Sequence, residues 1–367
     1  MARMQRLIVL AVIAATVLAA APAAEAATPR APKGFFGVMW DRAAMDGRPV
    51  DPDAQWALMH RSGVESVRVV FSWAQAQPEA GVEPNFSEID KKVELAARNG
   101  IELLPVVLYT PDWAATYPAR HGTPPKFPSD YAAFVTQLVR RYGPQGTFWD
   151  ERPDLPRRPL RDWQIWNEPH FDFYWYTPEG SWAPEYVKLL RAAKTAIKVE
   201  DPGARVVLAG FADASWKVLS AAYKAGARGA FDVATINLFT GRPGFVMTAA
   251  RLTRHVLNRA RDFRKPIWVT ETTFPAARGQ VPPPEQDWQR RWYTTRSGMA
   301  SRLAELYRLG AVNANRLRLR RIYWYTWASS YKGQDDLFDY SGLVRLGEDG
   351  ASSQQPALRA YRRASRN

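Results

Sequence analysis

The feature that most constrains the fold of this chain is a regular alternation of short apolar segments with longer amphipathic ones. The short segments are typical of buried β-strands, and we predict strands at Gly34–Trp40, Glu65–Trp73, Ile101–Tyr109, a segment starting at Trp163, Arg205–Ala209, Phe231–Phe239, Pro266–Glu271 and Arg321–Trp327. The segments between them predict helices at Asp51–Arg61, Phe86–Asn99, Asp130–Tyr142, Pro184–Val199, Trp216–Ala225, Val246–Phe263, Glu285–Leu309 and Pro356–Arg363.

This order of elements predicts the fold class. Short apolar strands that alternate with helices pair in parallel through right-handed crossovers. Eight such units within 367 residues fit an α/β fold of the (β/α)8 TIM-barrel type. An open doubly wound sheet is the alternative, but Gly34-Phe35-Phe36-Gly37 opens a strand and no junction carries a glycine-rich phosphate loop. We see no internal repeat and predict a single domain over residues 34–367.

The amino-terminal residues 1–26 resemble a secretory signal peptide. Arg3 and Arg6 form a charged start, Leu7–Ala21 is apolar, and Ala24-Glu25-Ala26 is a small-x-small cleavage site. Residues 27–33 read as a linker. A retained anchor is the alternative, although the apolar run is short for a membrane span and no later stretch is long enough. We therefore expect a secreted, extracellular protein without a membrane span after cleavage.

Charge and composition exclude some classes of function. The chain has no cysteine, so it has no disulfide and no thiolate nucleophile or ligand. Its formal net charge of +14 is compatible with association with anionic cell-wall polymers, with an acidic glycan substrate, or simply with solubility. Basic residues are spread along the chain apart from the run Arg316–Arg321, and no nucleic-acid-binding motif accompanies them. No metal motif such as H-E-x-x-H appears, so we expect neither metal nor cofactor.

The motif Trp166-Asn167-Glu168-Pro169 places an amide and a carboxylate directly after an apolar segment. Ile165 and Trp166 suit a buried strand, and Pro169 ends it because proline cannot donate to a ladder. Asn167 and Glu168 then lie at the carboxyl end of the fourth strand, where barrels place their active sites. Taken alone, the motif is equally compatible with a carboxylate that caps the next helix.

A second carboxylate, Glu271, ends the seventh predicted strand. Alternation places Ile267, Val269 and Glu271 on one face. In a barrel, Glu271 and Glu168 meet at the same mouth although they are far apart in sequence. Two carboxylates that face one pocket suit glycoside cleavage, since one can protonate the leaving oxygen while the other stays ionised and attacks the anomeric carbon.

These two motifs carry a family resemblance. Trp166-Asn167-Glu168-Pro169 after the fourth strand and Trp268-Val269-Thr270-Glu271 on the seventh resemble glycoside hydrolase clan A, whose members are retaining (β/α)8 glycosidases. Within the clan the chain is most similar to family 39, including its bacterial exopolysaccharide-degrading endoglycosidases, over nearly all of the residues after the leader. The resemblance implies that Glu168 is the general acid/base and Glu271 the nucleophile of a double displacement. It also implies that Asn167 bonds the sugar 2-hydroxyl.

The resemblance has one geometric requirement and one departure. Because adjacent strand residues face opposite sides, the chain must bend or bulge at Asn167 for both Asn167 and Glu168 to reach the pocket. Family members often have a histidine and a tyrosine near the end of the sixth strand. Here Asn237 and Phe239 take these places, and Phe239 has no hydroxyl to offer the nucleophile.

Arg68 is the expected cation of the site. It lies in the second strand between Val67 and Val69, where an unpaired guanidinium would be costly to bury. The clan has an arginine at this place, and pairing with Glu271 would keep that carboxylate ionised. A salt bridge elsewhere is the alternative. We therefore expect Glu168 to titrate high and Glu271 to titrate low.

Aromatic residues complete the expected site. The chain has 15 Trp, 15 Tyr and 16 Phe, many of them in loops, although packing is the alternative for any single ring. Trp327 ends the eighth strand and suits a stacking floor for a sugar. The predicted substrate-binding residues are thus Asn167, Arg68, Trp327, Asn237, Trp113, His170 and Trp175.

Together these patterns predict an enzyme: a secreted retaining glycoside hydrolase that cleaves O-glycosidic bonds in a polysaccharide. The loop aromatics favour endo action, because they suit an extended cleft for an oligosaccharide or polysaccharide. Two alternatives remain at this point, a catalytically silent carbohydrate-binding barrel and a transglycosylase that remodels cell-wall glycan.

Overall fold

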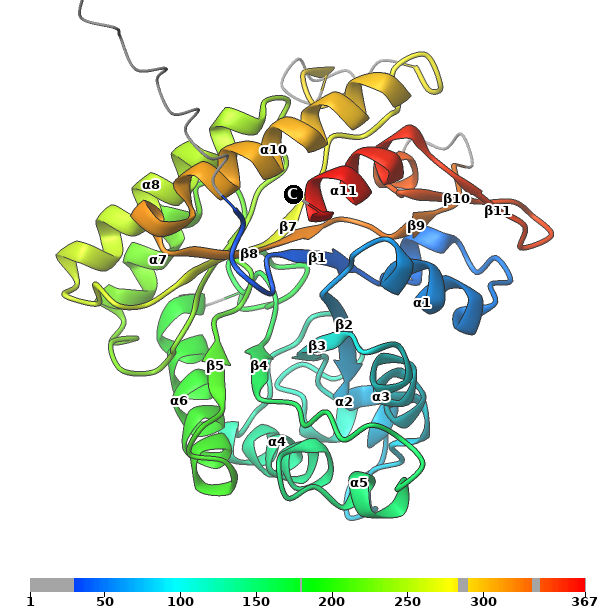
Figure 1. Ribbon diagram of the computed structural model, residues 1–367. Coiled ribbons are helices and arrows are strands. Elements are labelled where there is room, and N and C mark those ends of the chain that lie inside the picture. Colours follow the sequence, from blue (N-terminus) through cyan, green and yellow to red (C-terminus); the bar gives the residue numbers. More distant parts are fainter. Residues whose placement is uncertain (1–29, 179, 283–289, 332–336, 367) are drawn as a thin grey trace, which may run out of the picture.

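The computed structural model describes residues 30–178, 180–282, 290–331 and 337–366 (Figure 1). The predicted signal peptide and the start of the linker lie outside these residues. Eight parallel strands form one sheet in the order β5-β4-β3-β2-β1-β8-β7-β6. A bridge between Val207 and Val233 joins β5 to the start of β6 and closes the barrel. The strands are β1 (Phe36–Met39), β2 (Ser66–Ser72), β3 (Glu102–Leu108), β4 (Asp162–Ile165), β5 (Arg205–Val207), β6 (Ala234–Asn237), β7 (Ile267–Thr272) and β8 (Leu319–Trp324).

The predicted (β/α)8 barrel is therefore confirmed, and its helices lie around the outside of the strands (Figure 1). Local signals set several of their ends. The Asp51 carboxylate caps the first helix by accepting from the Ala54 N–H at 3.1 Å, and Gly100 ends the third in a left-handed conformation with φ 68°. The helices are α1 (Pro52–Arg61), α2 (Trp73–Ala76), α3 (Ser87–Asn99), α4 (Pro128–Tyr142), α5 (Thr147–Glu151), α6 (Trp182–Glu200), α7 (Ser215–Lys224), α8 (Pro243–Arg259), α10 (Arg296–Leu317) and α11 (Pro356–Arg366).

The helix predicted at 285–309 is the main error in the element boundaries. In the structure α10 runs from Arg296 to Leu317, and residues 285–289 of the prediction lie outside the described part of the chain. The predicted helix ended just before Gly310, and glycine is a residue that commonly ends helices. Instead Gly310 lies inside the helix, where a Cβ would come within 2.9 Å of Phe35 and Ile322. The glycine therefore allows α10 to pack closely against the barrel.

A small second sheet follows the barrel and was not predicted. It contains β9 (Ala328–Ser329), β10 (Val344–Leu346) and β11 (Ser352–Gln354), in the order β11-β10-β9. Its strands have two or three residues each, too few for a period-two pattern to be recognised.

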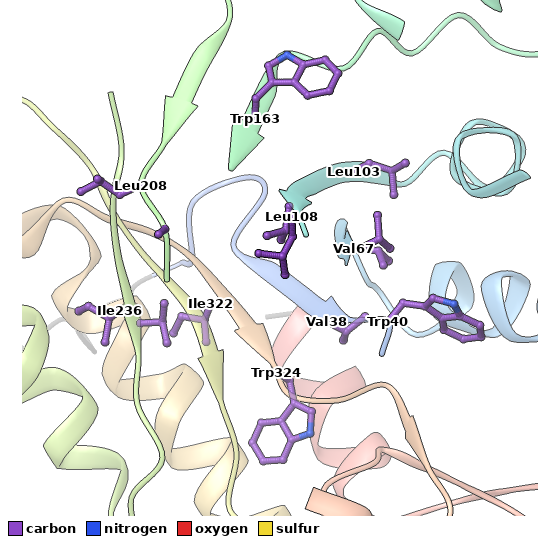
Figure 2. Packing of buried hydrophobic residues seen from close by; sticks show 14 of the residues in the cluster. Val38, Trp40, Val67, Leu103, Leu108, Trp163, Leu208, Ile236, Ile322 and Trp324 are labelled. Carbon is purple, nitrogen blue, oxygen red and sulfur yellow. The ribbon is translucent and has the colours of Figure 1, made fainter. Parts of the chain in front are cut away.

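The core has two parts. The larger part joins the strands to the helices around them, and Figure 2 shows members from all around the barrel, among them Val38, Val67, Trp163 and Ile322. A smaller cluster fills the barrel interior and is made of Leu104, Val207, Val233, Trp268 and Tyr323. Among the described residues, no helix is both long enough and apolar enough to cross a membrane.

Candidate active site

Arg68 on β2 is the centre of the polar network at the carboxyl ends of the strands. Its side chain is 1% exposed. Nη1 donates to Glu271 Oε1 at 2.5 Å, and Nη2 donates to Asn167 Oδ1 at 2.8 Å. Nε donates to Gln164 Oε1 at 2.7 Å. A buried guanidinium is tolerated only when its donors are satisfied, so this arrangement fixes residues of β2, β4 and β7 relative to one another.

The backbone turns sharply where β4 ends. Trp166 and Glu168 both have positive φ, 69° and 41°, which are sparsely populated values for such side chains and cost about 1–3 kcal/mol each. The Trp166 ring is buried, and its Nε1 donates to the Tyr174 carbonyl at 2.8 Å. The Glu168 N–H donates to the Gly210 carbonyl at 3.0 Å. The expected bend at Asn167 is thus confirmed, since neighbouring Asn167 and Glu168 both join the network.

Asn237 at the end of β6 holds the Glu168 carboxylate. Its Nδ2 donates to Glu168 Oε1 at 2.7 Å. The Thr270 hydroxyl donates to Asn237 Oδ1 at 2.7 Å, which fixes the orientation of the amide. A register shift between Ile236 and Asn237 brings Asn237 opposite Glu271 on β7. Asn237 therefore lies between the two glutamates.

Gly210 makes room for Asn237. A Cβ on Gly210 would lie 2.4 Å from Asn237 Nδ2, closer than side chains tolerate. The same residue accepts the Glu168 N–H and forms a bridge with Asn167. Sequence reasoning missed Gly210, because no local signal distinguishes a close approach from an ordinary loop glycine.

The two glutamates have different electrostatic surroundings, although each is only 8% exposed. Burial raises the pKa of Glu168 to about 8, the nearby Glu271 charge adds to this, and the Asn237 hydrogen bond opposes it. Burial also raises the pKa of Glu271, against the opposing Arg68 ion pair. The expected high pKa of Glu168 is confirmed, whereas the expected low pKa of Glu271 is wrong, because burial outweighs the cation. Of the two, only Glu271 forms an ion pair with a cation of the described residues, so Glu168 is the group of the pair that retains a proton at neutral pH.

Two of the predicted substrate-binding rings are buried. Trp327 is 0% exposed and its Nε1 donates to Gln55 Oε1 at 2.9 Å. Trp175 is 2% exposed, and its ring packs edge-on against Trp166 at 5.2 Å. Neither ring presents a face on which a sugar could stack, so these two assignments are wrong. Alternation placed Trp327 at the end of the eighth strand, but it could not show that the ring is buried and bonded to Gln55.

Tyr325 takes the position that was expected for Trp327. It is partly exposed, directly follows β8, and donates its hydroxyl to Asp41 Oδ2 at 2.5 Å. Its ring contacts Phe239 edge-on at 5.8 Å. Phe239 therefore supports the Tyr325 ring.

Trp113 and His170 have different surroundings. Trp113 follows β3, is 37% exposed, and packs edge-on against Trp73 at 5.5 Å. Its role in binding stays a prediction. His170 packs between the rings of Phe171 and Phe211, and neither of its ring nitrogens has a hydrogen-bond partner among the described residues. Burial lowers the pKa of His170 to about 4, so the ring is neutral.

The structure adds residues that the sequence analysis did not include. Gln164 on β4 accepts from Arg68 and donates its Nε2 to the Leu208 carbonyl at 2.9 Å. Met39 on β1 places its sulfur 3.3 Å from Arg68 Nη1. A polar residue inside an apolar strand was the signal that could have identified Gln164. Within the described ranges, no group of three or more histidine and acidic side chains is arranged to hold a metal ion.

No protein-family profile matches the chain, and no curated protein matches it in sequence. Solved structures do resemble it. A family 39 glycoside hydrolase from the gut symbiont Bacteroides cellulosilyticus WH2 matches with a TM-score of 0.60 and 17% identity, over 91% of this chain and 64% of that one. A monomeric β-xylosidase from Caulobacter crescentus CB15 matches with a TM-score of 0.62 and 18% identity, over 91% and 68%.

A GH53 catalytic domain from Ignisphaera aggregans matches with a TM-score of 0.59 and 20% identity, over 91% of this chain and 97% of that one. The chain thus spans about two thirds of the length of the first two structures and nearly all of the third. These likenesses establish that the barrel has the architecture found in several glycoside hydrolases.

Proposed function

We propose that this protein is a retaining glycoside hydrolase that cleaves O-glycosidic bonds in a polysaccharide. The observation that carries the proposal is the unequal pair of buried glutamates at one barrel mouth. Glu271 contacts the Arg68 guanidinium at 2.5 Å, whereas Glu168 contacts the neutral Asn237 amide and has a pKa raised to about 8. Glycoside cleavage needs this combination of one ionised and one protonated carboxyl group, and retention is proposed from the resemblance of the two glutamate motifs to clan A.

The roles follow from these surroundings. In the first step Glu168 gives its proton to the leaving oxygen while the Glu271 carboxylate attacks the anomeric carbon and forms a glycosyl ester. In the second step the Glu168 carboxylate takes a proton from water, the water oxygen attacks the anomeric carbon, and Glu271 leaves as a carboxylate. Arg68 is a positioning residue that holds Glu271 and stabilises its charge.

Asn167 is proposed to bind the sugar. Its Oδ1 accepts from Arg68, and among the described residues its Nδ2 donates to none. The amide is therefore oriented with its oxygen toward Arg68 and its nitrogen available for a substrate hydroxyl. A bond to the 2-hydroxyl that strengthens in the transition state would contribute several kcal/mol to the rate.

Endo action is also part of the proposal. Exposed rings follow β3 and β4, with Trp113 and Phe171 each 37% exposed and Phe173 61% exposed. Aromatic planes outside the reacting subsite suit a polymer that extends past the point of cleavage. Export through cleavage after Ala26 is proposed from the sequence alone, and sequencing the amino terminus of the secreted protein tests it.

The direct test is release of reducing ends from a panel of neutral and acidic polysaccharides, with Glu271→Gln as the inactive control. We expect the wild type to release shorter products from at least one glycan, with an early fall in polymer length. Binding without release from any glycan would favour a silent carbohydrate-binding barrel. Products longer than the substrate would favour a transglycosylase.

A further inference from the structure

The amino-terminal ends of the strands carry two adjoining cavities on the side of the barrel opposite the glutamates. The first has a volume of about 510 Å³ and is lined by Lys33, Arg205, Arg264, Arg318, Arg320 and Arg321. The second has a volume of about 520 Å³ and is lined by Arg157, Arg158 and Arg161. Glu102 and Arg205 line both. We refer to these two cavities together as the basic face.

Part of this charge is neutralised within the protein. Arg321 pairs with Glu102 at 2.6 Å, and Arg205 pairs with Asp162 at 2.6 Å. Both guanidinium groups also lie over the ring of Trp268, at 4.6 and 5.1 Å from its centroid. These interactions build a rigid floor for the cavities at the bottom of the barrel.

Arg157 and Arg161 likewise pair with Asp150 and Asp201, at 3.1 and 2.9 Å, but four other cations of the basic face have no such partner. Lys33, Arg158, Arg264 and Arg318 are exposed, and within the described residues none of them forms an ion pair. They come from four separate segments, which precede β1, β4, β7 and β8. These segments meet at one end of the barrel, so the fold brings together four cations that are far apart in the sequence.

A neighbouring buried arginine responds to this charge. Arg254 on α8 donates to the carbonyls of Leu317 and Lys265 at 3.1 and 2.6 Å. Burial lowers its pKa to about 10, and the charges of Arg318 and Arg320 contribute to the decrease. Arg318 and Arg320 therefore act on a charged group outside the two cavities.

We propose that the basic face is a second binding site, which holds an anionic polysaccharide whose sugars carry carboxylate or phosphate groups. Exposed cations from four separate segments suit repeated charges along a chain better than a single ion. Guanidinium groups match the planar oxygens of both anions, and the cavity volumes lie in the usual range for ligand sites. The choice of a polysaccharide rests on the proposed glycosidase activity, whereas the choice of a polyanion does not.

The test compares two full-length triple variants that lose the same positive charge. Lys33→Gln/Arg264→Gln/Arg318→Asn alters the basic face, with asparagine at 318 because Arg318 has a φ of 51°. Lys188→Gln/Lys217→Gln/Arg251→Gln alters exposed cations on outer helices. Binding to polygalacturonate, to a phosphorylated mannan and to duplex DNA is measured by calorimetry at low and moderate salt, with neutral xylan as a control. Thermal melting checks that both variants are folded.

We expect the first variant to bind the anionic polymers at least about tenfold more weakly than the wild type, and the second to change less than about twofold. Wild-type affinity should fall as salt rises, because these charges are exposed. The more tightly bound polymer identifies the preferred anion. Equal losses in both variants, no binding of either polymer, a matching loss of xylan binding, or tighter binding of duplex DNA would each overturn the inference.

Activity separates this inference from the proposed function. None of the substituted residues lies at the barrel mouth, so both variants should release reducing ends from a neutral glycan at the wild-type rate. If the wild type hydrolyses no glycan but binds polygalacturonate through the basic face, the proposed function fails and the second site stands.

Discussion

The barrel has a buried arginine near each end, and the two differ in what surrounds them. Arg68 is 1% exposed at the carboxyl end and contacts Glu271, Asn167 and Gln164. Arg321 is 6% exposed at the amino end and pairs with Glu102, whose side chain is 51% exposed. Arg321 also contacts the Tyr323 hydroxyl and lies over Trp268, whereas Arg68 lies over no aromatic ring in the described part of the chain.

This difference separates a site that can react from a site that holds the fold together. At the amino end, Asp162 has a second cation in Arg205 and Glu102 reaches solvent, so no group depends on one partner. At the carboxyl end, Arg68 is the cation that contacts Glu271, and Asn237 is the group that contacts Glu168. Substitutions at the two ends should therefore have opposite effects on turnover and on stability.

The largest expected effect is loss of turnover in Glu271→Ala. Removing the proposed nucleophile should lower kcat/KM at least about 10⁴-fold, which corresponds to several kcal/mol of barrier. Asp162→Asn at the amino end is the matched control, and it should keep activity within about threefold. Initial rates on the best glycan measure both.

Glu168→Ala distinguishes the roles of the two glutamates. It should lose far less activity on an aryl glycoside with a good leaving group than on a natural glycan, because such a leaving group needs no proton. Azide should restore its rate and give a glycosyl azide of retained configuration, since azide enters without a general base. If azide instead rescues Glu271→Ala with that product, the two assignments are reversed.

Exchanging each arginine for methionine tests the comparison directly. Arg68→Met should lower kcat/KM about 10²–10³-fold, because Glu271 loses the cation that favours its charge. Arg321→Met should lower the free energy of unfolding by about 2–3 kcal/mol, since Asp162 and Tyr323 lose a buried partner, and should leave kcat nearly unchanged. Urea unfolding and steady-state kinetics on both variants separate these outcomes. A larger loss of turnover in Arg321→Met than in Arg68→Met would contradict the comparison.

Gly210→Ala should lower kcat about tenfold to a hundredfold. The added methyl would displace Asn237 and break its hydrogen bond to Glu168. Gly244→Ala at the start of α8 is the control, because a Cβ there meets nothing within 4 Å. Equal kinetics in the two variants would show that Asn237 does not position Glu168.

The pH profile of kcat/KM should be bell-shaped, with its alkaline limb near pH 8. Activity falls there because Glu168, whose pKa is raised to about 8, loses the proton that it must donate. The Asn237 hydrogen bond favours the charged form, so Asn237→Ala should move the alkaline limb to higher pH. Arg68 also favours the charged form of Glu271, so Arg68→Met should move the acid limb to higher pH. Asp162→Asn should move neither limb.

The smallest expected effect is on thermal stability. A carboxyl group whose pKa is raised in the folded state stabilises the protein below its unfolded value, and this contribution is lost as pH rises through the folded value. For Glu168 the loss lies between about pH 4.5 and pH 8. Glu168→Gln should therefore melt above the wild type at pH 9 and close to it at pH 4. An equal difference in melting temperature between the variant and the wild type at pH 4 and pH 9 would argue against a buried, protonated Glu168.

The sequence predicted the barrel and the meeting of Glu168 with Glu271, because hydrophobic runs, turn residues and strand order are local signals. It also predicted the bend at Asn167. Adjacent residues of a regular strand face opposite sides, so Asn167 and Glu168 can reach one pocket only if the chain bends. It could not place Trp327 and Trp175 correctly, because loop burial depends on distant segments such as Gln55 and Trp166. The prediction of a low pKa for Glu271 was wrong for the same reason, since the depth of burial is a property of the assembled barrel.

The turn that presents Glu168 has a consequence for the evolution and engineering of this protein. Trp166 and Glu168 hold backbone conformations that glycine or asparagine would adopt with less strain. The Trp166 ring is buried and its loss would leave a cavity, so a laboratory selection for heat resistance alone should favour replacement of Glu168. Survivors of such a selection would be easier to purify and crystallise, yet inert toward substrate. Screens for robust variants of this protein should thus apply temperature and turnover in the same round.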